Sequence, residues 1–199
     1  MKPVVLTFSG HRLVAPASGY FIFRHGTTSI AGTTYKTAQI GSQEWLAENL
    51  QLDDGGSGIY TGQSAPYASE HFYTWDAAIR VAATVGDGWH LPTQAEFTTL
   101  VTTAGGRSVA GKALKSLSGW KSNGNGVDKY GFSALPVGDR NEQGVIGNNG
   151  FDAYFWGATE MSYYNTYAYR IWLYYDEDWA DDGFGLKNCG FSIRLVRSA

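Results

Sequence analysis

The chain has 199 residues, a formal net charge of −3 at pH 7 and a single cysteine, Cys189. It is long enough to bury a core, and its 15% aromatic and 17% charged residues argue against disorder. The mildly acidic balance supplies no basic surface for a nucleic acid or an anionic membrane. One cysteine excludes an intrachain disulfide and a thiolate metal cluster, and no apolar run reaches the roughly 20 residues that span a bilayer.

Residues 1–32 are predicted to form a strand-rich extension to a main domain of residues 33–199. Two alternating sets of side chains indicate a strand there: Tyr20, Ile22 and Arg24 on one side, Phe21 and Phe23 on the other. We expect this segment to pack on the main domain, the alternatives being a separate module, an added edge strand and an arm that pairs chains into an oligomer. The stretch VVLTF is too short for the apolar region of a secretion signal. The protein is therefore expected in the cytoplasm, or on an extracellular surface or virion that it reaches by another route.

The main domain is predicted to run from strands through two helices to further strands. A first strand is expected over Tyr35–Ile40. Helical spacing of apolar residues predicts the first helix: Trp75, Ala78, Ile79, Ala82 and Ala83. A capping box of Thr93 and Glu96 opens the second helix, whose buried stripe is Phe97, Leu100 and Val101.

After these helices, Gly, Asn and Asp turns separate short apolar segments. A short third helix is expected within residues 111–120. Strand-like segments follow at 131–138, 142–147, 153–160, 166–175 and 190–197. The order predicts an α+β fold with mainly antiparallel short strands and many loops.

Four ordered motifs carry a family resemblance. They are Ile40–Leu50 (IGSQEWLAENL), Tyr73–Ala78 (YTWDAA), Gly88–Phe97 (GWHLPTQAEF) and Gly190–Arg194 (GFSIR). Together they resemble the Fibrobacter succinogenes major paralogous domain over about residues 33–197. The stretch VAATVGDGW departs from the family, which often has a Cys-containing, Pro-bearing turn before its GW.

The resemblance implies a C-type-lectin fold related to that of formylglycine-generating enzymes. Domains of this kind also serve as variable proteins of diversity-generating retroelements, which randomise adenines near the 3′ end of a gene and so turn Asn codons into codons for Tyr, Asp, Ser or Gly. Twelve of the 36 residues from Tyr154 to Cys189 are aromatic, and Asp, Asn, Ser and Gly fill most of the gaps. The surrounding frame is Trp156, Arg170, Trp172 and Ser192–Arg197.

This segment is predicted to form a variable face that binds a protein or glycan receptor. Tyr offers a large, rigid, amphipathic surface, and Ser, Gly and Asn add adaptable hydrogen bonds, as in antibody paratopes. The alternative is that the tyrosines pack as half-buried strand residues; Trp156, Trp172 and Ile193 are expected in the core. The predicted face comprises Gly157, Ser162, Tyr163, Tyr164, Asn165, Tyr167, Tyr169, Tyr175, Asp176, Asp178, Asp181, Asp182, Phe184 and Asn188.

Enzymatic activity is not expected from this set of residues. A formylglycine-generating activity requires copper-binding or redox cysteines, and Cys189 stands alone. The four histidines lack the spacing of an iron-binding cluster: His11, His25, His71 and His90. His90 is predicted to be packed and hydrogen-bonded. No Ser/His/Asp arrangement or phosphate-binding loop is present, so we predict neither catalysis nor an obligatory cofactor.

Calcium binding is the one metal-binding possibility that the sequence leaves open. A hard cation could take oxygen ligands from the acidic run, although a solvated loop explains it better: Asp176, Glu177, Asp178, Asp181 and Asp182. The Glu-Pro-Asn, Gln-Pro-Asp and Trp-Asn-Asp motifs of sugar-binding C-type lectins are absent. The sequence therefore favours a retroelement-diversified receptor-binding or adhesive protein, such as a phage tail or cell-surface adhesin. The alternative is a non-diversified carbohydrate- or protein-binding surface domain of the same family.

Overall fold

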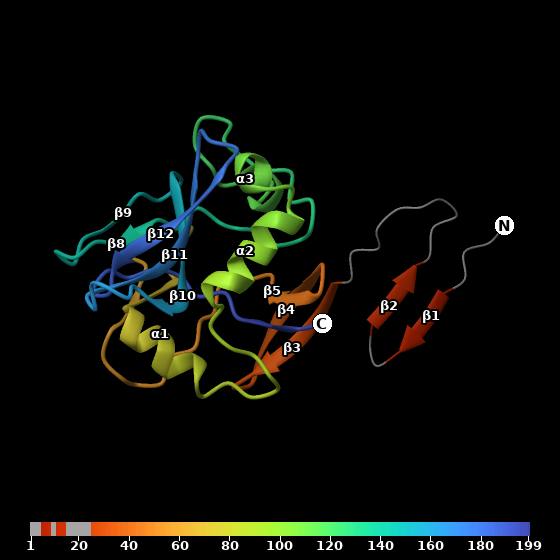
Figure 1. Ribbon diagram of the computed structural model, residues 1–199, viewed down its shortest axis with the longest axis horizontal. Coiled ribbons are helices and arrows are strands. Elements are labelled where there is room, and N and C mark those ends of the chain that lie inside the picture. Colours follow the sequence, from red (N-terminus) through yellow and green to blue (C-terminus); the bar gives the residue numbers. More distant parts are fainter. Residues whose placement is uncertain (1–4, 9–10, 15–24) are drawn as a thin grey trace.

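The computed structural model describes residues 5–8, 11–14 and 25–199, with side chains from residue 25 onward. Near the N-terminus, β1 (Val5–Phe8) and β2 (His11–Val14) pair as an antiparallel hairpin (Figure 1). The alternating residues that predicted a strand at 20–24 lie outside the described residues.

A four-stranded antiparallel sheet begins the main body, in the order β13–β5–β4–β3. Its strands are β3 (His25–Ile30), β4 (Thr33–Ile40), β5 (Gln43–Leu46) and β13 (Val196–Ser198). Ala31 and Gly32 join β3 to β4 with φ of 48° and 83°, the left-handed region that suits a two-residue hairpin turn. Because β3 lies within residues 1–32, the end of the predicted extension forms the edge strand of this sheet.

Three short helices follow: α1 (Trp75–Ala82), α2 (Gln94–Thr103) and α3 (Arg107–Leu114). Thr74 caps α1 by accepting from the Ala77 N–H, and Thr93 forms the predicted capping box with Glu96 on α2. The two main helix predictions are confirmed. The third helix begins four residues before the expected range.

The second main sheet is three-stranded and antiparallel, in the order β10–β11–β12. Its strands are β10 (Asp152–Glu160), β11 (Tyr167–Tyr174) and β12 (Ala180–Leu186). Two small ribbons complete the described strands: β6 (Ile59–Thr61) with β7 (His71–Tyr73), and β8 (Asp139–Arg140) with β9 (Ile146–Gly147).

Two buried clusters join these elements. In the first, Phe97 and Leu100 of α2 pack with Tyr169 and Ile171 of β11 and with Trp45 of β5. The second gathers α1 with residues of β10 and of the segment that precedes β13. Helices α2 and α3 therefore cover one face of the β10–β11–β12 sheet, as Figure 1 shows.

The predicted α+β C-type-lectin fold, with two helices packed on mainly antiparallel strands, is wrong. Within the described residues the protein is mainly β, with three helices of eight, ten and eight residues against thirteen strands in small antiparallel sheets. The helical stripes are real but short, since α2 stops before the positive-φ glycines Gly105 and Gly106. Turns divide the rest of the chain into short strands.

Two strand predictions also fail. Residues 131–138 and 190–195 form isolated bridges in place of continuous strands, such as Phe191 with Tyr73 and Ser192 with Phe155. Their backbone groups bond to several different elements, so no single neighbouring strand aligns them. Apolar alternation predicts burial there correctly, but burial alone does not require a ladder.

Candidate functional site

The β10–β11–β12 sheet has two faces of different character. Tyr169, Ile171 and Leu173 of β11 are buried in the cluster that contains α2 and α3, so the residues between them point to the opposite side. The strand register places residues of β10 and β12 beside them. We call this opposite side the outer face. Its partly exposed members are Tyr154, Arg170, Trp172, Tyr174, Asp181 and Gly183.

Aromatic rings cover the centre of the outer face. Tyr154 and Trp172 stack with their centroids 5.6 Å apart and their planes 2° apart. The Arg170 guanidinium lies 5.7 Å and 5.4 Å from the same two ring centroids, within cation–π distance. Trp179 meets Trp172 edge-on at 5.5 Å, and Phe191 stacks on Tyr154 at 4.8 Å. Phe191 is itself buried, and it belongs to the second buried cluster, which covers this end of the sheet. The exposed part of the outer face is therefore a group of aromatic rings from Tyr154, Trp172 and Trp179, with the Arg170 charge beside it.

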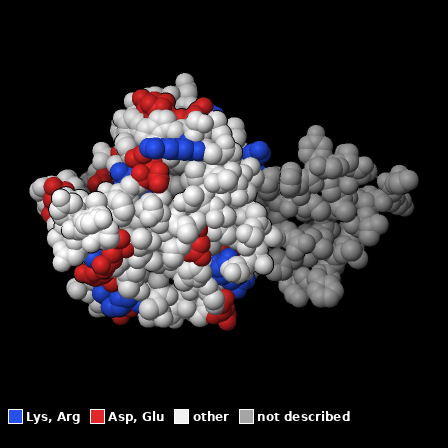
Figure 2. Space-filling view, in the orientation of Figure 1, with Lys and Arg blue, Asp and Glu red and all other residues white. Residues whose placement is uncertain are grey.

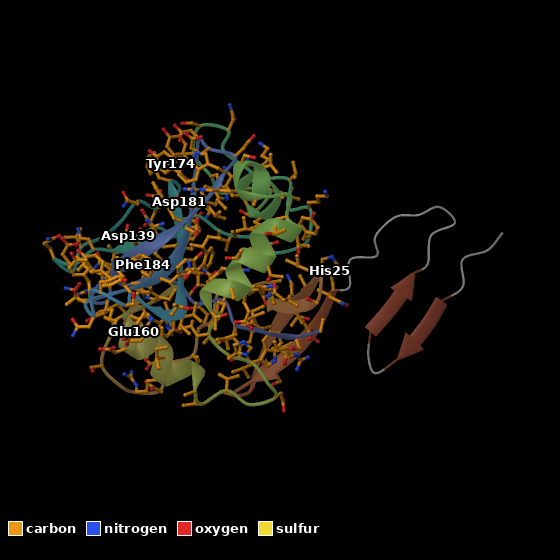
Figure 3. All side chains as sticks on the ribbon, in the orientation of Figure 1. His25, Asp139, Glu160, Tyr174, Asp181 and Phe184 are labelled. Carbon is orange, nitrogen blue, oxygen red and sulfur yellow. The ribbon has the colours of Figure 1, made fainter. Side chains whose placement is uncertain are left out.

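Carboxylates flank this aromatic surface. Asp181 accepts from Arg170 at 3.4 Å and also pairs with Arg107 at the start of α3. Asp152 accepts from the Trp172 indole N–H at 2.8 Å. Figure 3 shows Asp181 and Tyr174 near one another at the edge of the sheet, and in Figure 2 acidic and basic side chains are interspersed on the visible side of the molecule. Charge of both signs therefore accompanies the rings.

The Asp152 carboxyl makes stability depend on pH. Burial raises its pKa from 3.8 to about 6, against the opposing hydrogen bond from Trp172. Between those two pH values the folded state holds more protons than the unfolded state, so this group's contribution to stability falls as pH rises. We expect Asp152→Asn to match the original chain near pH 4 and to exceed it by about 2 kcal/mol above pH 6. Urea unfolding across this range measures the difference, and parallel curves would contradict the assignment.

The turn between β11 and β12, residues 175–179, is held through its backbone. The buried Lys115 ammonium donates to the carbonyl oxygens of Tyr174 at 3.1 Å, Tyr175 at 3.2 Å and Glu177 at 2.9 Å. The Lys112 N–H donates to the Asp178 carbonyl at 3.0 Å. A Cβ on Gly111 would lie 2.1 Å from the Trp179 carbonyl oxygen, so only glycine admits this approach. The scaffold therefore holds the turn 175–179 through its main-chain carbonyl oxygens.

Removal of the Lys115 ammonium is expected to loosen this turn. In Lys115→Met the three carbonyls lose a common donor, which costs about 1–3 kcal/mol of unfolding free energy. Amide hydrogen exchange should accelerate across residues 174–179. Lys112→Met is the matched control, because Lys112 lies one turn away and is more exposed, and it should cost less than about 1 kcal/mol. Equal effects of the two substitutions would contradict the role given to Lys115.

The loop between β10 and β11, residues 161–166, is ordered in a similar way. Its main chain closes through the Tyr167 N–H to the Tyr164 carbonyl and the Lys187 N–H to the Thr166 carbonyl, at 3.0 Å and 2.9 Å. The Tyr163 and Tyr164 side chains are 88% and 62% exposed. Large amphipathic rings therefore project to solvent from a loop that one local backbone bond closes and one bond from Lys187 ties to the end of β12.

The structure divides the predicted variable face. Exposed members are Ser162, Tyr163, Tyr164, Asn165, Asp176, Asp178, Asp182 and Asn188, and half-buried members are Tyr167, Tyr175, Asp181 and Phe184. Gly157 and Tyr169 are buried, so they cannot belong to a solvent-exposed face. The strand register puts Asp182 and Phe184 beside Ile171 and Tyr169, away from the outer face. Trp156 and Ile193 are in the core as predicted.

Sequence reasoning missed part of the outer face. The prediction that Trp172 lies in the core is wrong, because its side chain is partly exposed on the outer face. Arg170, a predicted frame residue, is also on this face, and Tyr154, Tyr174 and Gly183 are not in the predicted set. The signal was the period of two in YAYRIWLY: Ile171 and Leu173 are the apolar anchors, so Arg170, Trp172 and Tyr174 take the other side and Tyr169 turns inward. Counting outward from these anchors identifies the face.

The carboxylates of the acidic run 176–182 are not grouped around a common point. Among the residues whose side chains are described, no three His, Cys, Asp or Glu side chains are grouped to hold a metal. Asp176 and Asp178 are exposed on the turn, while Asp181 pairs with Arg107 and Arg170. These carboxylates have separate partners or solvent, unlike the shared oxygen cage that calcium requires.

Two other residues singled out in the sequence have structural partners. His90 contacts the Gly88 carbonyl at 2.8 Å and a Glu96 carboxylate oxygen at 2.6 Å, which confirms the predicted hydrogen bonding, although its side chain is 45% exposed and so only partly packed. Burial raises the pKa of the Cys189 thiol to about 11, and the neighbouring Glu142 carboxylate adds to this shift. A thiol that stays protonated at neutral pH is a poor nucleophile. In the part of the chain described, no helix is long and apolar enough to cross a membrane.

Comparison with known families agrees with the motifs. The model of the Fibrobacter succinogenes major domain matches residues 38–197, and the chain belongs to this family. Comparisons with curated proteins and with solved structures found no match.

Proposed function

We propose that the protein binds a receptor, a protein or a glycan, through the outer face and the two loops at opposite ends of β11, residues 161–166 and 175–179, which together we call the recognition surface. The observation that carries the proposal is how these loops are held. Lys115 and Gly111 contact main-chain carbonyl groups of the turn 175–179, and the Lys187 N–H donates to the Thr166 carbonyl of the loop 161–166. Side chains such as Tyr163 and Asp178 are left exposed. A surface built in this way accepts new side chains without loss of the fold.

The chemistry of the surface suits recognition. Tyr and Trp rings supply large contact areas at low conformational cost, and an arginine among them is typical of binding hot spots. Asp176 and Asp178 add charge at the rim, where it steers partners and costs little to desolvate. Gly183 adds no side chain between Arg170 and solvent, which leaves space beside the guanidinium.

We further propose that a retroelement diversifies this surface. Support comes from the residue mix of the segment 154–189 and from a scaffold that holds it by the backbone. The test compares the last ~150 bases of the gene with any nearby imperfect copy beside a reverse-transcriptase gene. Mismatches confined to template adenines, at codons for surface residues such as Tyr163, Asp176 and Asp181, are expected. The absence of such a copy would exclude diversification and leave a receptor-binding domain of constant sequence.

A constant carbohydrate-binding domain is the second candidate. Tyr154 and Trp172 stack on one another and are partly exposed, and Arg170 and Asp181 lie beside them. Apolar rings next to hydrogen-bonding groups suit the C–H and O–H sides of a sugar ring. A glycan array on the purified chain tests it, with Trp172→Ala as the variant that should lose any signal. Either mode places the protein on a cell surface or a virion, where a receptor is accessible. Pairing of chains through residues 1–32 would raise a weak affinity by multivalency.

A further inference from the structure

The Asp152 carboxylate lies in the outer face without a cationic partner. Asp152 is the first residue of β10, is 5% exposed and pairs across the sheet with Tyr174 of β11. The Trp172 indole N–H donates to its Oδ1 at 2.8 Å. Its second oxygen, Oδ2, has no hydrogen-bond donor among the described residues, yet it is not cut off from solvent. Because a buried charge normally has an ion partner, this oxygen is an acceptor open to a ligand.

Asp139 brings a second carboxylate to the same side of the sheet. Gly138 forms a bridge with Ala153, whose side chain is buried on the side of the helices, so Asp139 points to the outer face as Asp152 does. Asn148 Nδ2 donates to Asp139 Oδ1 at 2.7 Å. Within the described part of the chain, neither of the two aspartates forms an ion pair. Two adjacent carboxylates therefore share this part of the face without a cation of their own.

The ionised form of Asp152 is unfavourable in this place. Burial raises its pKa to about 6, and the Asp139 and Asp176 carboxylates add to the shift. The Arg170 guanidinium acts against the shift, but it pairs with Asp181 at 3.4 Å. The fold thus retains a carboxylate that is mostly charged at neutral pH and lowers its stability. Groups of this kind are concentrated at functional sites, where stability is given up for binding or chemistry.

The aromatic rings around these carboxylates suit a guanidinium group. The Arg170 guanidinium already lies 5.7 Å and 5.4 Å from the Tyr154 and Trp172 ring centroids. Tyr174, directly opposite Asp152, is half-buried, and the cation–π contacts of the described residues do not include its ring. A guanidinium is planar, stacks on aromatic rings and donates to carboxylates. An arginine from outside the chain would meet both a ring and an open acceptor here.

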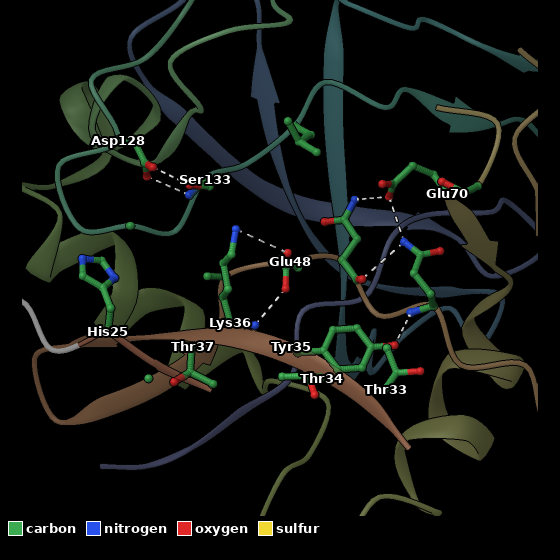
Figure 4. A pocket seen from close by; sticks show the side chains of 17 residues that line it. His25, Thr33, Thr34, Tyr35, Lys36, Thr37, Glu48, Glu70, Asp128 and Ser133 are labelled. Carbon is green, nitrogen blue, oxygen red and sulfur yellow. Dashed lines mark hydrogen bonds and ion pairs between the residues drawn. The ribbon is translucent and has the colours of Figure 1, made fainter. Parts of the chain in front are cut away.

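The cleft between β4 and the loop 128–135 provides a contrast (Figure 4). Its three carboxylates, from Glu48, Glu70 and Asp128, each meet two donor groups of the chain itself. One of these donors is the Lys36 ammonium, 3.9 Å from Glu48. The carboxylates of the cleft are thus already provided with donors, so a cationic ligand gains less there than at Asp152.

We propose that the outer face binds an arginine side chain of a protein receptor, with its guanidinium over the Tyr174 ring and its N–H groups donating to Asp152 and Asp139. The inference rests on the proposed function and narrows it, because it selects a protein with a basic residue over a glycan. Sugar hydroxyls would also donate to Asp152 Oδ2, but a neutral sugar leaves both carboxylate charges uncompensated. A guanidinium supplies the complementary charge and the donors together.

Nα-acetyl-arginine amide tests the site on the full chain, with Nα-acetyl-citrulline amide as the matched probe. The two have nearly the same shape, but citrulline carries a neutral urea in place of the guanidinium. The Trp172 indole N–H, which donates to Asp152, is a direct NMR reporter of the site. We expect the arginine probe to shift this signal saturably and the citrulline probe to bind about tenfold more weakly, as loss of one charge-assisted hydrogen bond implies. Equal responses to the two probes, or no response to either, would overturn the inference.

Asp152→Asn separates a role in binding from a role in the fold. Asparagine removes the charge but keeps an oxygen that accepts from the Trp172 indole. The variant should be at least as stable as the original chain at neutral pH and should bind the arginine probe about tenfold more weakly. A carboxylate that only the fold requires would give the opposite result, with lower stability and unchanged binding, and this result would refute the inference.

Asp178→Asn is the control for diffuse electrostatic attraction. Asp178 is an exposed carboxylate on the turn 175–179, so its loss should leave binding of the arginine probe unchanged. An equal loss of binding in Asp178→Asn and Asp152→Asn would indicate general attraction to an acidic surface, which contradicts a specific site at Asp152.

Failure of this inference is distinguishable from failure of the proposed function. The probes report on the surroundings of Asp152 alone, whereas the proposed function is tested by the effect of Tyr163→Ser on receptor binding. A glycan-array signal without any response to the arginine probe would overturn the inference and keep the recognition surface. Receptor binding that no substitution on this surface weakens would instead refute the proposed function and, with it, the inference that a receptor supplies the arginine.

Discussion

Arg194→Met is expected to reduce the free energy of unfolding by about 3–5 kcal/mol, the range for removal of one partner from a buried charged network. Arg194 is fully buried. Its guanidinium donates to Asn49 Oδ1 at 2.7 Å, to the carbonyls of Leu46 and Ser133 at 3.2 Å and 3.1 Å, and to the Phe132 carbonyl. Methionine fills much of the volume but leaves these four acceptors without a donor.

The network of Arg194 joins segments that are distant in the chain. Burial lowers its pKa to about 10, so the guanidinium remains charged at neutral pH, and it lies over the Phe132 ring at 4.8 Å. Arg197→Met is the matched control. Arg197 is partly exposed and pairs with Glu44 at 2.8 Å, so its loss should cost less than about 1 kcal/mol. Urea unfolding measures both, and a loss below 1 kcal/mol for Arg194→Met would show that the acceptors find other donors.

Local features of the fold were predictable from sequence. The capping box of Thr93 and Glu96 predicts the residue at which α2 begins, and the stripe of Phe97 and Leu100 identifies the buried side of the helix. Both signals lie within one or two turns of helix, where sequence spacing translates directly into contact. The family motifs were likewise readable, and the match over residues 38–197 confirms them.

The arrangement of the last segment was less predictable. GFSIRLVR alternates like a strand, yet along the segment its backbone bonds to Tyr73, Leu50 and Leu46 in turn, and its arginine enters the core. An arginine in an alternating pattern normally indicates the solvent side. Here four acceptors from segments distant in the chain make burial of the Arg194 guanidinium favourable. The sequence around Arg194 does not indicate these acceptors.

The outer face, in contrast, is predictable from the sequence. One apolar anchor, Ile171, determines which side of β11 each neighbouring residue takes. A prediction that treats the tyrosines as one group ignores this alternation and therefore places the buried Tyr169 on the exposed face.

Tyr169 and Tyr163 provide the sharpest test of how the recognition surface is separated from the scaffold. Tyr169 is 1% exposed, packs on Phe97 and Phe184 with centroids 6.1 Å and 5.9 Å away, and donates its hydroxyl to Asp182 at 3.2 Å. Tyr169→Ser removes a buried ring and should cost about 3–5 kcal/mol of unfolding free energy. Tyr163→Ser makes the same chemical change at an exposed site and should alter it by less than about 0.5 kcal/mol.

Receptor binding is expected to respond in the opposite order. At a temperature where both variants remain folded, Tyr163→Ser should weaken binding directly, by the loss of an exposed aromatic contact, while Tyr169→Ser should affect it only through stability. Urea unfolding and a binding titration on the same samples separate the two effects. If Tyr163→Ser destabilised the fold as much as Tyr169→Ser, the loop 161–166 would depend on its side chains. It could then not serve as a variable surface, because each new residue there would have to satisfy the scaffold before it could meet a receptor.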